Sequence, residues 1–190
     1  MKKRESKLKF EVVGIKEETN VLMPLSTSDQ LVRGDKLYPA SNEIELPENP
    51  YELLGNVLDA YGESIEGYRF KNKVRWESAG KPPSPLKRAR IKEAIETKIK
   101  AIDGFLTIGR GQKIGIFAGT GVGKSTLLGL LAKQSTEDVN VIALIGERGR
   151  EVREFIEREL GEEGMKRSVV VVSTSDESSL MQIKASGISN

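Results

Sequence analysis

Residues 118–126 read AGTGVGKST, and this segment limits the possible folds of the chain more than any other. An apolar run at residues 114–117 precedes it, and a longer apolar run at residues 127–132 follows it. A strand, a glycine-rich loop that ends in Lys-Ser, and a helix form the architecture of a phosphate-binding P-loop. The segment therefore predicts an α/β fold in which this loop joins a buried strand to a helix.

The residue types of the loop suit a bound phosphate chain. Glycines without a Cβ atom let the loop wrap tightly and turn its N–H groups toward one point, and the following helix adds the positive end of its dipole. Lys124 supplies a mobile charge for the β- and γ-phosphates, and the hydroxyl of Ser125 can bind Mg²⁺. We predict that ATP and Mg²⁺ bind at this loop, through Gly119, Thr120, Gly121, Val122, Gly123, Lys124, Ser125 and Thr126.

The loop departs from the usual pattern at one position, because Ala118 stands where the first glycine is expected. This is a mild departure, since the glycines nearest the phosphates and the Lys-Ser pair are intact. The alternative interpretation is a glycine-rich turn with Lys124 as a solvated cap. The strand-like and helix-like runs on either side favour the phosphate site.

Composition excludes several classes of function. With 190 residues, of which 37% are hydrophobic and 31% charged, the chain is typical of a soluble globular protein. The net charge of +2 argues against nucleic acid as a partner. No apolar run approaches the roughly 18–20 residues that span a bilayer, so any membrane contact is expected to be peripheral. Cysteine and histidine are absent, which excludes disulfides, Cys/His zinc sites and histidine bases, and agrees with a cytoplasmic location.

The first part of the chain has the periodicity of a β-protein. Short runs at residues 8–15, 20–25 and 30–38 predict strands of an antiparallel meander or of part of a small barrel. Further on, the prolines of residues 81–85 predict a stiff, extended connector. After the connector a short amphipathic helix is predicted from the spacing of Ile91, Ile95, Ile99 and Ile102.

The second part of the chain has an α/β pattern. Continuous apolar runs at residues 113–118, 139–145 and 168–173 predict strands that are buried on both faces of a parallel sheet. Residues 124–133 and 150–160 predict helices between these strands, and Gly161 predicts the end of the second helix.

A second group of candidate residues, GERGRE at residues 146–151, follows the strand predicted at 139–145. Ligands of open α/β sheets bind at the carboxyl ends of the strands, so Glu147 is expected to project toward the γ-phosphate and to orient the attacking water. Arg148 is expected either to stabilise phosphate charge or to hold Glu147 by a salt bridge. The alternative is a charged turn whose acidic residues cap the following helix.

These segments resemble one family. GRGQKIGIFAGTGVGKSTLLGLLA, VNVIALIGERGREVREFIERELGEEGMKRSVVVVSTSDES, LGNVLDAYGESIEG and IKAIDGFLTIGRGQ are similar to the flagellum-specific and type III secretion export ATPases, relatives of the catalytic subunit of rotary F-type ATP synthases. The resemblance implies that Glu147 is the catalytic glutamate, with Arg148 its neighbouring arginine, and that Lys124 and Ser125 contact the phosphates and Mg²⁺. Non-catalytic subunits have Gln at this position, so Glu147 favours the hydrolytic branch.

The resemblance also implies a fold, an activity and partners. The fold is a partial RecA-like P-loop core with a parallel sheet in residues 47–190, preceded by the last strands of an N-terminal β-barrel in residues 1–46. The implied activity is Mg²⁺-dependent ATP hydrolysis that energises flagellar or type III protein export. The implied partners are ATP or ADP, further copies in a homohexamer and export-apparatus proteins, in the cytoplasm or at the inner face of the cell membrane.

Two departures accompany the resemblance. Lys98 stands where the family usually has glycine. The family continues beyond the segment that ends at Asn190, through the Walker B aspartate and an intersubunit arginine, so we expect a fragment of a longer ATPase. The alternatives are a truncated nucleotide-binding or interaction module that does not hydrolyse ATP, an inert relic, and a fragment of an ATP synthase catalytic subunit.

We predict that the isolated 190-residue chain hydrolyses ATP negligibly and tends to aggregate. An arginine that stabilises the transition state typically contributes about 10³–10⁵ in rate, and a sheet that lacks neighbouring strands exposes apolar surface. Phosphate release by purified monomer, measured in wild type and in Lys124→Ala, tests this expectation. Steady turnover that disappears in Lys124→Ala would contradict it.

Overall fold

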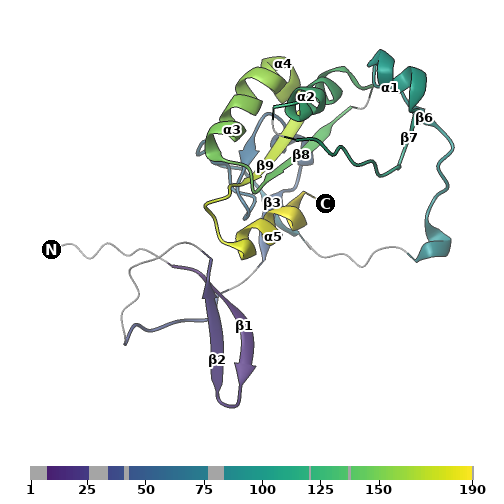
Figure 1. The fold of residues 1–190 in the computed structure, drawn as a ribbon. Helices are drawn as coiled ribbons and strands as arrows, with labels where there is room; N and C mark the ends of the chain where they lie inside the picture. The colour runs from purple at the N-terminus through teal and green to yellow at the C-terminus, as the bar shows by residue number, and fades with distance from the viewer. Residues whose placement is uncertain are drawn as a thin grey trace.

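The centre of the fold is a three-stranded parallel sheet. The computed structural model describes residues 8–25, 34–40, 43–76, 84–119, 121–136 and 138–189. The strands β4 (Val57–Leu58), β9 (Ser168–Ser173) and β8 (Asn140–Ile145) lie in the order β4-β9-β8. Figure 1 shows β8 beside β9. All residues of β9 are buried, as expected for the central strand of a sheet covered on both faces. The parallel strands predicted at 139–145 and 168–173 are thus confirmed, whereas β4 was not predicted.

Alternate residues of β9 face different layers. Val170 and Val172 belong to a core cluster with residues of a helical layer, which is formed by α2 (Lys124–Gln134), α3 (Gly149–Glu154) and the π-helical segment η3 (Phe155–Leu160). Val171, between them, packs in a second cluster with Met181 and Ala185 of α5 (Ser179–Ile188). The two-residue alternation of a strand therefore separates the helical layer from α5.

The helix α2 (Lys124–Gln134) confirms the helix predicted directly after the glycine-rich loop. The second predicted helix is less regular than expected. It consists of α3 (Gly149–Glu154) and a π-helical segment η3 (Phe155–Leu160), and a further helix, α4 (Gly161–Lys166), follows.

The prediction that this helix ends at Gly161 is confirmed, because η3 ends at Leu160 and Gly161 is its C-cap residue. Gly161 has φ +58°, which glycine adopts at little cost, so the chain bends there before α4 begins. Leu160 and Met165 pack on the same core cluster on either side of the bend.

The strand predicted at residues 113–118 is also wrong, because these residues have no regular secondary structure. Phe117 is 97% exposed, and Ile114 is 47% exposed. A strand needs a hydrogen-bonding partner, and within the described ranges β8 pairs only with β9. Ile114 and residues of β8 line the same two cavities.

The N-terminal strands form a hairpin. β1 (Phe10–Lys16) pairs antiparallel with β2 (Thr19–Pro24), which confirms two of the predicted strands. The third strand was predicted at residues 30–38. Residues 30–33 lie outside the described residues, and residues 34–38 do not form a strand. A second antiparallel pair joins β3 (Ile44–Pro47) to β5 (Lys73–Trp76). The boundary after residue 46 stays a prediction.

The hairpin is attached to the body of the molecule through α5. The hydroxyl of Ser178, the N-cap residue of α5, donates a hydrogen bond to the carbonyl oxygen of Leu25 at 3.1 Å. Leu25 is buried in the cluster under α5, and Lys184 of α5 lies 3.5 Å from the carboxylate of Glu11 in β1. The strands and the C-terminal helix therefore contact each other although they are far apart in sequence (Figure 1).

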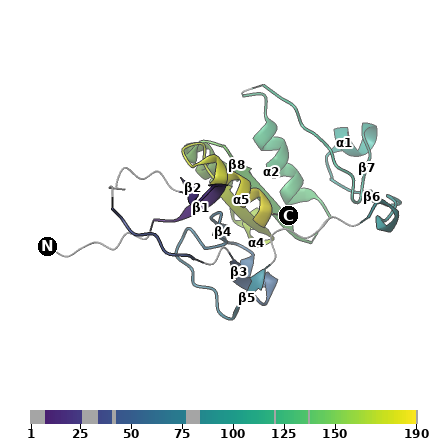
Figure 2. The ribbon, with the colours of Figure 1, turned by 90° about the horizontal axis from the view of Figure 1, so that it is seen from below.

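The amphipathic helix predicted from the four isoleucines is largely wrong. Only α1 (Lys100–Phe105) is helical, and the short strand β6 (Ala94–Ile95) precedes it and pairs with β7 (Ile108–Gly109). These elements lie beyond α2, on the side away from the β1–β2 hairpin (Figure 2). Of the predicted connector, residues 81–83 lie outside the described part, and Pro85–Lys87 form a 3₁₀ turn, η2.

Lys98, where the family usually has glycine, lies in the corner between β6 and α1. The backbone N–H and the hydroxyl of Thr97 donate to Asp103 Oδ1 at 3.0 and 2.7 Å, and these bonds, the hydroxyl bond first, lower the pKa of Asp103. The chain then turns through Lys98 with φ +59°. This is the left-handed region, which strains a residue with a Cβ atom but not glycine. The glycine expected from the resemblance suits this position better than lysine does.

We predict that Lys98→Gly stabilises the chain by about 0.5–1 kcal/mol, because it removes left-handed strain. The matched control is Lys100→Gly, which places glycine in the first turn of α1 and is expected to destabilise the chain by about 0.5–1 kcal/mol. Urea unfolding midpoints measure both changes. Equal destabilisation by the two variants would show that Lys98 is not strained.

Candidate functional site

The glycine-rich loop leads directly into the start of α2. Gly121 and Gly123 have φ +77° and +96°, so both positions need a residue that tolerates the left-handed region. Gly123 is the N-cap residue of α2, and Lys124, Ser125 and Thr126 form its first turn. The backbone N–H groups of a first helical turn lack partners within the helix and attract anions.

The surroundings of this loop are open. A Cβ atom placed on Gly119, Gly121 or Gly123 would meet nothing within 4 Å, and Val122 is 68% exposed. Thr120 lies outside the described residues. The loop backbone is therefore accessible to a ligand on the side that these three glycines face.

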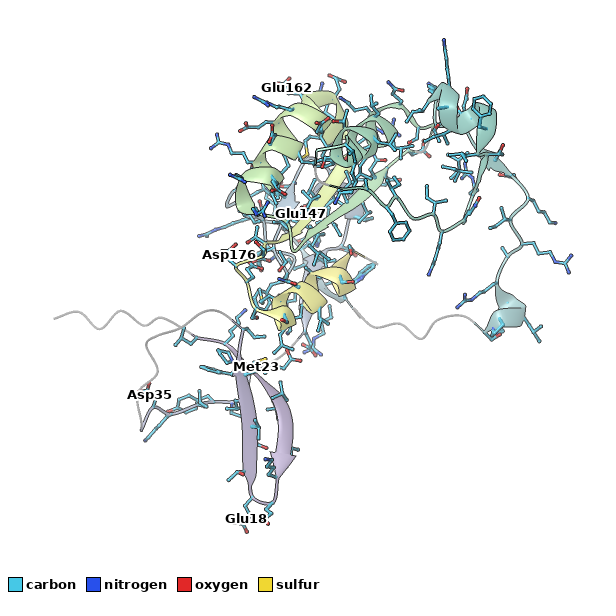
Figure 3. The ribbon with its side chains drawn as sticks, in the orientation of Figure 1. Glu18, Met23, Asp35, Glu147, Glu162 and Asp176 are labelled. Carbon is cyan, nitrogen blue, oxygen red and sulfur yellow. The ribbon has the colours of Figure 1, made fainter. Side chains whose placement is uncertain are left out.

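Glu147 follows β8 through a turn that is fixed by β9. Gly146, with φ +74°, donates its N–H to the carbonyl oxygen of Ser173 at 2.8 Å, and the N–H of Ser175 donates to the carbonyl oxygen of Glu147 at 3.0 Å. Figure 3 shows Glu147 at the same end of the sheet as Asp176 and far from Glu18 at the tip of the hairpin. The prediction that Glu147 lies at the carboxyl end of the sheet agrees with this geometry.

Lys124 and Glu147 form an ion pair. The distance from Lys124 Nζ to Glu147 Oε1 is 3.4 Å, across 23 positions of sequence, and both side chains are more than one third exposed. The two groups of candidate residues that the sequence suggested thus come together. Because the pair is half-exposed, solvent weakens it, and Lys124 can exchange this carboxylate for another anion.

Arg148 pairs with Glu151 in this structure. Its Nη1 atom donates to Glu151 Oε1 at 2.6 Å, and this hydrogen bond is the main cause of the lowered pKa of Glu151. Glu151 was not predicted as a site residue. The spacing of three positions from Arg148 at the start of a helix was the signal that could have indicated it.

A cavity of about 370 Å³ joins these residues. Its polar lining consists of Lys124, Ser125, Glu147 and Glu151, and the remainder is apolar and comes from residues 114 and 116, α2, β8, α3 and η3. A second cavity, of about 330 Å³, lies beside it and shares the lining residues Ile114, Leu128 and Leu131. The candidate site is thus a polar region next to apolar space.

The oxygen atoms available fit a hard cation. Among the residues that the structure describes, no three His, Cys, Asp or Glu side chains are grouped so that they could hold a metal by themselves. Ser125 and the carboxylates of Glu147 and Glu151 line one cavity, and Mg²⁺ typically takes one or two protein oxygens together with water and substrate phosphates. The donor set suits Mg²⁺ that arrives with a nucleotide better than a resident metal.

Comparison with known proteins identifies relatives. Residues 98–189 match the sequence model of the ATP synthase alpha/beta family, nucleotide-binding domain. The flagellum-specific ATP synthase of Bacillus subtilis (strain 168) is 49% identical over 179 residues, which are 94% of this chain and 41% of that protein. The type 3 secretion system ATPase of Xanthomonas euvesicatoria is 44% identical over 92% of this chain and 40% of its own length.

Solved structures show the same relationship. The assembled ATPase EscN of the enteropathogenic E. coli type III secretion system matches with a TM-score of 0.85 and 37% identity, over 98% of this chain and 45% of that chain. EscN in complex with its central stalk EscO matches with a TM-score of 0.88 and 37% identity, over 98% of this chain and 46% of that chain. The resemblance to export ATPases is confirmed, as is an α/β fold with a parallel sheet and N-terminal antiparallel strands. The chain spans about two fifths of the length of the relatives it matches.

No helix within the described ranges is both long enough and apolar enough to cross a membrane.

We predict that Glu147→Gln strengthens the binding of a nucleoside triphosphate about two- to fivefold. The substitution removes a carboxylate that competes with phosphate for Lys124, and half-exposed ion pairs contribute about 0.2–1 kcal/mol. Titration calorimetry with ATP and Mg²⁺ measures the change. Glu157→Gln, on the exposed side of η3, is the matched control. Weaker binding in Glu147→Gln than in the control would show that the carboxylate of Glu147 does not compete with phosphate for Lys124.

Proposed function

We propose that this chain, which is similar to the export ATPases over nearly all of its length, binds Mg²⁺-ATP at the AGTGVGKST loop and belongs to an ATPase that energises flagellar or type III protein export. The observation that carries the proposal is the meeting of Lys124 and Glu147 at 3.4 Å, on a cavity that Ser125 also lines. A phosphate-binding cation, a metal-binding hydroxyl and a carboxylate are the groups that nucleotide hydrolysis requires.

In this proposal the loop binds the phosphates through backbone N–H groups and Lys124. The contact residues are Gly119, Thr120, Gly121, Val122, Gly123, Lys124, Ser125 and Thr126. Ser125 is the protein ligand of Mg²⁺, which neutralises charge on the phosphates when it is bound. The open space around the glycines supports this assignment, because a phosphate chain needs close access to the loop backbone.

Glu147 is proposed to act on the attacking water. When the triphosphate takes Lys124, the carboxylate of Glu147 becomes available to accept a hydrogen bond from a water molecule and to orient it toward the γ-phosphate. Arg148 follows directly and is assigned to the same step as a source of positive charge. Its present partner, Glu151, keeps the guanidinium at the start of α3.

The proposal extends to organisation and partners. Residues 1–46 belong to an N-terminal β-barrel domain, and residues 47–190 belong to the P-loop ATPase domain. The whole protein forms a homohexamer and contacts export-apparatus proteins in the cytoplasm, with peripheral membrane contact. The EscN structures, one of an assembled ATPase and one with a central stalk, support an oligomer with partners.

A second candidate is a nucleotide-binding module that does not hydrolyse ATP. Residues 113–118, which lead into the loop, have no strand partner within the described ranges, and Phe117 is 97% exposed. A loop with weak support on its N-terminal side can bind phosphates without holding them in a reactive geometry. Tight Mg²⁺-dependent binding without turnover would favour this candidate.

Calorimetric titration of the 190-residue chain with ATP tests the proposal. We expect Mg²⁺-dependent binding in wild type that weakens at least about tenfold in Lys124→Ala, since the variant loses the charge that contacts two phosphates. Lys166→Ala, which removes an exposed lysine from α4, is the control and is expected to bind like wild type. Equal affinity in Lys124→Ala and wild type, or no binding in wild type, would overturn the proposal.

A further inference from the structure

The hydroxyl of Thr126 is already engaged by the protein. Thr126 Oγ1 donates a hydrogen bond to Glu159 Oε1 at 2.9 Å, across 33 positions of sequence. Thr126 follows Lys124 and Ser125 in the first turn of α2, and Glu159 lies in the π-helical segment η3. One turn of helix therefore carries both the proposed phosphate-binding residues and an anchor to η3.

The backbones of α2 and η3 approach closely at the same residue. A Cβ atom on Gly129 would lie 2.7 Å from Glu159 Cβ and 2.9 Å from the carbonyl oxygen of Glu159. A second close approach follows, where a Cβ atom on Gly164 would lie 3.2 Å from Lys133 Cγ. Glycine at position 129 permits the contact, and Glu159 contributes to it with both its backbone and its carboxylate.

The π-helical turn directs Glu159 to α2. Phe155 and Leu160, at the two ends of η3, are buried in the core cluster. On the exposed side, Glu154 pairs with Arg158 and Glu157 pairs with Arg153, each at 2.7 Å. Glu159 is partly buried and takes part in neither pair. Such π-turns are often found at functional sites, because the additional residue in the turn redirects side chains.

The same helix begins beside Glu147. α3 starts two residues after Glu147 and continues directly into η3, so Glu147 and Glu159 belong to one continuous helical layer. α2 starts at Lys124. The contact between Thr126 and Glu159 thus connects the helix that carries Lys124 with the helix that follows Glu147.

We propose that Glu159 is a positioning residue, which through Thr126 holds the start of α2 at the distance from Glu147 that the site requires. The relevance of this role to ATP binding and hydrolysis rests on the proposed function. The hydrogen bond and the close approach at Gly129 fix α2 against η3, and the separation of Lys124 and Glu147 follows from that contact. Without the hydrogen bond the first turn of α2 can shift relative to Glu147.

Chemical labelling of Lys124 tests the geometry without nucleotide. Pairing with a carboxylate shields an amine from acylating reagents, so trace labelling with acetic anhydride, read by mass spectrometry, reports the Lys124–Glu147 pair. Glu159→Ala and Thr126→Val are expected to raise labelling of Lys124 about two- to fivefold, as Glu147→Gln does. The conservative variants Glu159→Gln and Thr126→Ser are expected to label like wild type. Lys166 is the internal reference in each spectrum.

Nucleotide affinity tests the functional part. Glu159→Ala and Thr126→Val are each expected to weaken Mg²⁺-ATP binding about three- to tenfold, and the double variant is expected to be no weaker than either single variant. Glu157→Ala, which removes a carboxylate from the exposed side of η3, is expected to bind like wild type. Urea unfolding of each variant separates a shift of α2 from general loss of stability.

The two measurements distinguish the possible failures. Unchanged labelling of Lys124 in both Glu159→Ala and Thr126→Val overturns the positioning role, whatever the affinity of wild type. Additive losses of affinity in the double variant overturn it as well, because residues that act through one hydrogen bond are not independent. Changed labelling combined with no ATP binding in wild type supports the positioning contact and rejects the proposed function.

Discussion

The parallel pairing of β8 with β9 is the interaction on which the remainder of the structure depends. It runs from Asn140 opposite Ser168 to Ile145 opposite Ser173, and the hydrogen bond from Gly146 to Ser173 extends it by one residue. This extension sets where Glu147 leaves the sheet. The same pairing buries Val170 and Val171 on opposite faces, so it supports the helical layer that contains the candidate site and, on the other face, α5 with its attached hairpin.

The sequence was sufficient where structure depends on local and continuous patterns. β8, β9 and α2 were predicted because each is an uninterrupted apolar run or directly follows a glycine-rich loop. The position of Glu147 at the sheet edge occupied by the loop was predicted from a rule on the ends of parallel strands, and the structure pairs it there with Lys124. The residue roles themselves stay predictions.

The sequence was insufficient to predict structure where contacts between residues distant in sequence determine the local conformation. Residues 113–118 have a strand-like sequence but no neighbouring strand to pair with within the described ranges. The composition of a segment does not show whether such a neighbouring strand is present. The helix α4, which follows Gly161, was not predicted, and its Met165 packs on the same core cluster as Leu160. The contact from Thr126 to Glu159 depends on a π-helical turn, which shifts side chains away from the spacing of an ordinary α-helix.

The ion pair between Lys124 and Glu147 has a consequence for the choice of ligand. In this structure the lysine is already neutralised by one carboxylate, so an incoming anion exchanges places with a resident charge instead of filling a vacant positive region. A ligand with a single negative charge gains little from such an exchange. A ligand with several adjacent charges gains more, since it can replace the carboxylate and also occupy the N–H groups at the start of α2. The pair therefore favours ligands with several adjacent negative charges over ligands with one.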